Sequence, residues 1–191
     1  MMRLALLSFF LTAAVAATAQ SNGITVPTLD KSPMDMVYFP VNYPVLKIQE
    51  KVSQPPVARV IYSRPQTNNR TIFGDLIEYG KVWRLGANEA TEVEFFKDVK
   101  IGGKKVAKGR YTMYALINPE AWTMILNKET DTWGSFKYDE KKDAVRMSVP
   151  VQKLPQTIDA FSLFFDKATT DSVNLVVEWD TVKVALPIGL K

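Results

Sequence analysis

The sequence contains no cysteine and no histidine. Without cysteine it cannot form disulfides, zinc–thiolate sites, iron–sulfur clusters or thiol nucleophiles. Without histidine it lacks the commonest metal ligand and the usual base of a serine hydrolase triad. It also has no glycine-rich nucleotide loop and no Asp-x-Asp-x-Asp-Gly calcium loop. We therefore predict no metal site and no cofactor, which leaves carboxylate catalysis, a Ser–Lys pair and non-covalent binding.

Long hydrophobic runs are lacking as well. The longest, Leu4 to Val15, is shorter than the roughly 20 apolar residues that a membrane-spanning helix needs. It follows Met1-Met2-Arg3 and precedes Ala17-Thr18-Ala19, so residues 1–19 are predicted to be a signal peptide cleaved before Gln20. We expect a periplasmic or secreted protein without a membrane span. A lipid anchor is also not expected, because acylation at the cleavage point needs a cysteine.

Charge is weakly basic and scattered. The formal net charge is +4, and the closest lysines flank Gly102-Gly103, where a hairpin tip is expected. Nucleic-acid binding needs a basic face interleaved with stacking aromatic residues. No such face is visible in the sequence, so nucleic acid is not a predicted partner.

From Ala58 to the end, apolar and polar residues alternate in short runs separated by turn residues. The pattern indicates about nine strands and predicts an all-β domain over residues 58–191, an antiparallel β-sandwich with the jelly roll as one variant. Tyr111 to Ile117 is expected to be a central strand, and Gly102-Gly103 a primed turn with positive φ angles. Glu92 and Glu94 fall on the predicted solvent face. A single helical turn is expected within 72–79 or 139–143.

Residues 20–57 have a different composition. Six prolines between Pro27 and Pro56 are expected to break any helix or central strand. Yet the stretch from Met34 to Leu46 is too apolar for a free linker. We predict an extended arm that packs across the sandwich.

One polar segment, Tyr62 to Thr91, combines arginines with aromatic and amide side chains. Arginine binds carboxylate or phosphate in a planar, bidentate manner, and loops at the ends of a sandwich are common binding positions. Gly86-Ala87-Asn88-Glu89-Ala90 suits a tight loop whose backbone approaches a neighbour closely. The candidate ligand-binding residues are Tyr62, Arg64, Arg70, Trp83, Arg84, Asn88, Glu89 and Thr91.

Motifs within and beyond this segment resemble the signature of domain of unknown function family 2911. The matching motifs are Ser32-Pro33-Met34-Asp35, Tyr62-Ser63-Arg64-Pro65, Ile72-Phe73-Gly74, Tyr79-Gly80-Lys81-Val82-Trp83-Arg84, Gly86-Ala87-Asn88-Glu89-Ala90-Thr91, Trp133-Gly134, Tyr138-Asp139-Glu140-Lys141-Lys142-Asp143 and Trp179 with Val182-Lys183-Val184. The resemblance covers nearly all of the chain after the signal and implies an exported, single-domain protein of the Bacteroidetes type. That family has no agreed activity or catalytic residues, so the resemblance implies no reaction.

Three functions stay open at this stage. The leading one is a non-catalytic binding module for a small anionic or carbohydrate ligand, held by Arg64, Arg84, Asn88 and Glu89. The second is a glycosidase-like hydrolase in which Glu89 works with Glu78 or Asp75, since glycosidases use paired carboxylates. The third is a structural or assembly protein in which the arginines form fixed ion pairs. A turn at Trp133-Gly134 is either a sugar-stacking edge or a packed rim.

Overall fold

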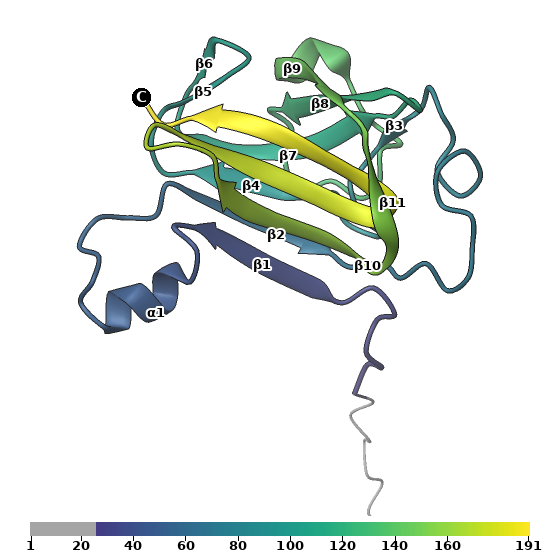
Figure 1. The fold of residues 1–191 in the computed structure, drawn as a ribbon, viewed down its shortest axis with the longest axis horizontal. Coiled ribbons are helices and arrows are strands. Elements are labelled where there is room, and N and C mark those ends of the chain that lie inside the picture. Colours follow the sequence, from purple (N-terminus) through teal and green to yellow (C-terminus); the bar gives the residue numbers. More distant parts are fainter. Residues whose placement is uncertain (1–25) are drawn as a thin grey trace, which may run out of the picture.

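The computed structural model describes residues 26–191, which form two antiparallel sheets packed against each other (Figure 1). Eleven strands and two short helical segments lie in this range. The predicted all-β sandwich is therefore confirmed. The predicted signal peptide, residues 1–19, and the first residues of the predicted arm lie outside the described residues.

The larger sheet has seven strands in the order β1-β2-β4-β7-β8-β9, with β3 paired to β7. Its strands are β1 (Met34–Phe39), β2 (Ala58–Ser63), β3 (Val82–Trp83), β4 (Glu92–Phe95), β7 (Gly109–Leu116), β8 (Ala121–Asn127) and β9 (Asp143–Pro150). β7 lies between β4 and β8, as expected of the run from Tyr111 to Ile117. Its apolar character on both faces fits a strand that is covered on both sides.

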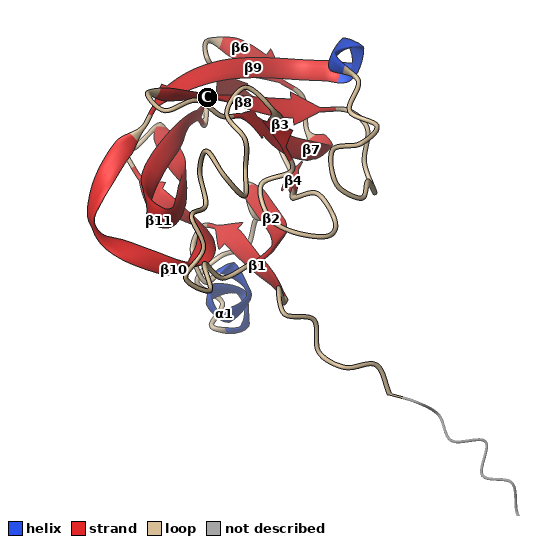
Figure 2. Cartoon of the chain, turned by 90° about the vertical axis from the view of Figure 1, so that its right-hand side faces the viewer, coloured by secondary structure: helices blue, strands red, loops and turns tan. Residues whose placement is uncertain are grey.

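The smaller sheet has four strands in the order β10-β11-β5-β6. They are β5 (Val99–Ile101), β6 (Lys104–Val106), β10 (Gln152–Lys167) and β11 (Ser172–Gly189). Gly102 and Gly103 join β5 to β6 with φ angles of 57° and 75°, which confirms the predicted primed turn. The pairing of β10 with β11 shifts register twice. Such shifts bend a strand, and β10 curves from the end of β9 toward β1 (Figure 2).

The core lies between the sheets, where alternate residues of each strand point. Val60, Val93 and Met113 are fully buried there. Trp83 occupies the middle of an aromatic cluster: its ring centroid is 5.9 Å from that of Trp179, 5.8 Å from Trp122 and 5.3 Å from Phe161. Contacts among these large rings stabilise this end of the sandwich, from which the polar loop after Trp83 extends.

The predicted arm contains regular structure. Met34–Phe39 is β1, hydrogen-bonded along β2, so the predicted boundary at residue 58 falls between two strands of one sheet. Tyr43–Ile48 forms helix α1, which extends beyond one end of β1 (Figure 1). The prediction that prolines exclude a helix here is wrong, because Pro44 occupies the first turn, where a helix needs no intrahelical N–H donor.

The outer face of the larger sheet is half covered. The segment from residue 128 to 142 lies across β7 and β8, where Tyr138 packs on Tyr114 with ring centroids 5.1 Å apart. This segment ends in a 3-10 helix, Glu140–Lys142, within one of the two ranges expected for a helical turn. Within residues 26–191, none of the helices has the length and apolarity required to traverse a bilayer.

Candidate functional site

A cavity of about 490 Å³, here called the Arg84 cavity, opens where β3 leaves the sheet. Its lining includes Trp83 and Trp179, which belong to the aromatic core cluster. The lining also includes the polar or charged residues Ser32, Arg70, Glu78, Lys81, Arg84 and Ser135 and the exposed Phe136, which come from segments far apart in the chain. Three of the eight predicted residues, Arg70, Trp83 and Arg84, therefore line one hollow.

Arg84 is the most unusual charge in the described part of the chain. Its Nε is buried and has no hydrogen-bond partner among residues 26–191. Within the same residues its guanidinium forms no ion pair. Burial lowers the pKa of the Arg84 side chain below its ordinary value, although an arginine stays ionised at any physiological pH. A cation is thus held partly out of water without a counter-charge.

The neighbouring charges give this cavity a basic balance. Lys81 and Arg70 line it together with Arg84, and Glu78 is the one acid in the lining. Arg70 is partly engaged, because its Nε and Nη2 donate to the main-chain oxygens of Thr67 at 3.0 Å and Gln66 at 2.7 Å. The surplus of positive charge favours an anion in the cavity.

The residues after Arg84 form a tight loop, 84–91, held by polar side chains. Gly86 has a φ of 147°, and a Cβ there would lie 2.8 Å from Ser63 Oγ. That hydroxyl donates to Ala87 O at 2.5 Å and accepts from Ala87 N at 2.7 Å. Trp83 Nε1 donates to Gly86 O at 3.0 Å. The close approach predicted for this glycine-containing loop is made by Ser63.

Arg64 lies in different surroundings. Its Nη1 contacts Asp35 Oδ2 at 3.0 Å, its Nε donates to Phe161 O at 3.2 Å, and its Nη2 donates to Ser162 Oγ at 3.1 Å. These contacts fasten the end of β2 to β1 and β10. This arrangement is the fixed ion pairing of the third hypothesis.

Two other candidates lie inside the fold. Tyr62 is 2% exposed, and its hydroxyl donates to Leu163 O at 3.2 Å. Burial raises the pKa of Tyr62 above its ordinary value. Thr91 is fully buried, and its hydroxyl donates to Leu85 O in the 84–91 loop. Tyr62 thus ties β2 to β10, whereas Thr91 supports the 84–91 loop from within the core.

Asn88 and Glu89 belong to the 84–91 loop but do not line the Arg84 cavity. Asn88 has a φ of 58°, a conformation that asparagine tolerates, and its main-chain oxygen accepts from Gly134 N at 3.0 Å. Glu89 is exposed and lines a second hollow of about 430 Å³, here called the Glu89 groove, together with Met34, Glu92, Asp131 and Trp133. Of the two acids predicted as its partner, Glu78 lines the Arg84 cavity and Asp75 lines neither hollow, so neither shares a hollow with Glu89.

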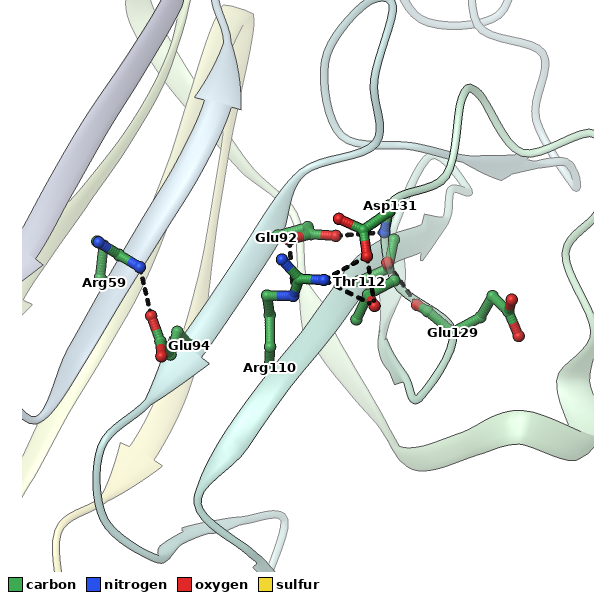
Figure 3. Close-up of polar contacts among 8 residues, drawn as sticks. Arg59, Glu92, Glu94, Arg110, Thr112, Glu129 and Asp131 are labelled. Carbon is green, nitrogen blue, oxygen red and sulfur yellow. Dashed lines mark hydrogen bonds and ion pairs between the residues drawn. The ribbon is translucent and has the colours of Figure 1, made fainter.

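Charged side chains on the bare half of the outer sheet face brace the groove (Figure 3). Arg110 on β7 contacts Glu92 on β4, with Nε 3.3 Å from Oε2, and its Nη2 also contacts Asp131. Glu92 Oε1 in turn accepts from Asp131 N at 2.6 Å. Farther along the same face Arg59 pairs with Glu94 at 2.5 Å. Glu92 and Glu94 thus lie on the outer face, as predicted, and Glu92 is tied into a network that positions Asp131.

Sequence reasoning did not place Lys81, Ser135 and Phe136 in the same site as Arg84. The Ser135 hydroxyl donates to Val82 O at 2.9 Å, which holds Ser135 beside Arg84 although 53 residues separate Ser135 from Val82 in the sequence. The available signal was the aromatic turn that starts at Trp133-Gly134. A turn whose aromatic side chains are not buried in the core is a candidate for the wall of a binding site.

Comparison with known proteins gives one match. A family model described as "Protein of unknown function (DUF2911)" matches residues 44–188. No curated protein matches the chain, and no solved structure matches it.

Proposed function

The chain belongs to the family of proteins of unknown function DUF2911, and from its own site we propose that it is an exported, non-catalytic binding protein that holds a small anionic ligand at Arg84. The single observation that carries the proposal is the partly buried Arg84 guanidinium, which has no partner among residues 26–191 and lines an open cavity.

An unpaired, partly buried cation opposes folding, because it loses hydration without gaining a counter-charge. A ligand carboxylate, phosphate or sulfate removes this penalty by accepting charge-assisted hydrogen bonds from the guanidinium. Lys81 and Arg70 add attraction from the rim, so an anion is favoured over a neutral molecule. A cavity of about 490 Å³ falls within the usual size range of small-molecule sites.

The 84–91 loop supports the same proposal, because it holds Arg84 in place before any ligand arrives. Ser63, Trp83 and Thr91 each donate a hydrogen bond to a main-chain oxygen of this loop. A site that is rigid in the free protein loses little conformational entropy on binding. The geometry therefore favours recognition of a ligand that fits an already formed cavity.

The test is a thermal-shift titration with matched probes, namely glucuronate against glucose, with citrate and inorganic phosphate alongside. At least one anion should raise the melting temperature of the wild-type protein, and glucose should not. Arg84→Met should abolish that rise, whereas Lys104→Ala, which removes one exposed charge at the distant hairpin tip, should retain it. A rise that persists in Arg84→Met, or no rise with any anion, contradicts the proposal. Mass spectrometry of the exported protein should place its first residue at Gln20.

A further inference from the structure

Three hollows adjoin one another along the loop 131–138. The Arg84 cavity includes Phe136, and the Glu89 groove includes Asp131 and Trp133. Between them lies a third hollow of about 500 Å³ that is lined by both Trp133 and Phe136. Phe136 is thus shared by the first and third hollows and Trp133 by the second and third, which makes the three hollows neighbours.

Both aromatic side chains are unusually open to solvent. Trp133 is 61% exposed and Phe136 is 85% exposed, although large aromatic rings normally gain free energy by burial. Neither belongs to the core cluster or to the smaller cluster beneath the 128–142 segment. Exposed rings beside open hollows are typical of interaction sites.

The loop presents these rings on a fixed backbone. Ala90 N donates to Thr132 O and Gly134 N donates to Asn88 O, both at 3.0 Å, which ties the loop to residues 84–91. Gly134 has a φ of 66° and lies so close to Phe136 that a Cβ would be 2.6 Å from the ring. A rigid backbone lets an aromatic face bind without an ordering penalty.

Charge changes sign along this surface. Arg84, Lys81 and Arg70 make one end basic. At the other end Arg110 pairs with Glu92 and Asp131, so Glu89 is the carboxylate without an ion pair among residues 26–191. The middle hollow is lined by Lys137 and by Lys142, which pairs with Glu129. A ligand that is anionic throughout would be repelled at the Glu89 groove. The occupant should therefore carry its negative charge at one end and be neutral where it meets the carboxylates, which then accept hydrogen bonds from hydroxyl groups.

We infer that the ligand is an oligosaccharide with one acidic end, whose carboxylate binds Arg84 and whose neutral sugar rings lie on Phe136 and Trp133. This inference rests on the proposed anion site at Arg84. The C–H face of a sugar ring is apolar and packs on an aromatic face, and its hydroxyls are hydrogen-bond donors for Glu89 and Asp131. Two exposed aromatic rings, with carboxylates at the end of the site away from Arg84, suit an oligosaccharide whose far end is neutral.

The experiment compares free glucuronate with an oligosaccharide of three neutral sugars capped by one glucuronate, by isothermal calorimetry. The capped oligosaccharide should bind wild-type protein at least tenfold more tightly than glucuronate. Trp133→Ala should remove most of that gain and leave glucuronate binding unchanged, while Arg84→Met should weaken both. Phe164→Ala, which removes an exposed ring of β10, is the matched control and should change neither affinity.

The outcomes separate the two proposals. Equal affinity for both probes, or no effect of Trp133→Ala on the oligosaccharide, overturns the inference and leaves the anion site standing. Failure of both probes in an assay where citrate or phosphate binds at Arg84 does the same. If no anion binds, both proposals fall. Release of free sugar that Glu89→Gln abolishes contradicts the non-catalytic role, and tighter binding of an acidic peptide of equal length contradicts the choice of a glycan.

Discussion

Arg64 and Arg84 come from one polar segment, yet their surroundings are opposite. Arg64 meets a carboxylate, a main-chain oxygen and a hydroxyl, so each of its three nitrogens has an acceptor. Arg84 has a buried Nε with no acceptor among the described residues and faces a cavity. Arg64 therefore holds strands together, whereas Arg84 retains hydrogen-bonding capacity for another molecule.

The two regions are linked by a single serine. Ser63 precedes Arg64 at the end of β2, and its hydroxyl bonds both the N–H and the oxygen of Ala87. The residue before the paired Arg64 thus holds the loop that follows the unpaired Arg84. Substitutions in these two regions should therefore have different effects on stability and on anion binding.

The largest effect is expected from Gly86→Ala. The new Cβ would lie 2.8 Å from Ser63 Oγ and 3.2 Å from Ser63 O, at a φ of 147°. Steric overlap and backbone strain together should lower the free energy of unfolding by about 2–4 kcal/mol. Urea unfolding followed by tryptophan fluorescence measures this loss, and the displaced loop should also lose the anion response of Arg84.

Gly80→Ala is the control for Gly86→Ala. Gly80 also has a positive φ, 74°, but a Cβ there would meet nothing within 4 Å. Strain alone should lower the free energy of unfolding by about 1 kcal/mol. Equal losses at the two positions would show that the contact with Ser63 does not hold the 84–91 loop.

The second effect compares the arginines directly. Arg64→Met removes an ion pair and two further hydrogen bonds, and since the Arg64 and Asp35 side chains are 37% and 39% exposed, solvent screening limits the loss. We expect the free energy of unfolding to fall by about 1–1.5 kcal/mol. Because the unpaired Arg84 charge opposes folding, Arg84→Met should leave the free energy of unfolding unchanged or raise it by up to about 0.5 kcal/mol. Urea unfolding at low salt compares the two variants, and an Arg84→Met loss as large as that of Arg64→Met would assign both arginines a structural role.

The smallest effect concerns how the contribution of Tyr138 to stability depends on pH. Tyr138 is the last residue of the loop 131–138, which carries Phe136, and its hydroxyl donates to Asp143 Oδ2 at 2.6 Å. Burial, and then the hydrogen bond to Asp143, raises the pKa of Tyr138 well above its ordinary value of 10.0. The folded state therefore favours the neutral phenol, so this contribution is fully present below pH 10 and is lost as pH rises above it.

Tyr138→Phe should accordingly lower the free energy of unfolding by about 0.5–1 kcal/mol at pH 8 and by less at pH 11. Urea unfolding at the two pH values measures the difference from wild type. A Tyr138→Phe difference that grows with pH would contradict the assigned direction.

Much of the fold was predictable from local pattern. The alternation of Val93 and Phe95 with Glu92 and Glu94 identified the inner and outer faces of β4, and Gly102-Gly103 identified the β5–β6 turn. The sequence does not predict β1 and α1, because prolines are expected to interrupt regular structure, whereas Pro40 lies just beyond β1 and Pro44 in the first turn of α1. The candidate segment contained Arg84 but could not separate it from Arg64.

By itself, the sequence determined the all-β class, the sides of the strands that face the core, and the chemistry that the chain cannot perform, because these depend on residue type and on period-two alternation. Only the tertiary structure decided which arginine is paired. The partners of Arg64 are 29 to 98 residues away along the chain, and part of the wall of the Arg84 cavity, Ser135 and Phe136, comes from the loop beyond β8. Long-range packing of the two sheets, rather than local sequence, brings these groups within bonding distance or leaves them apart.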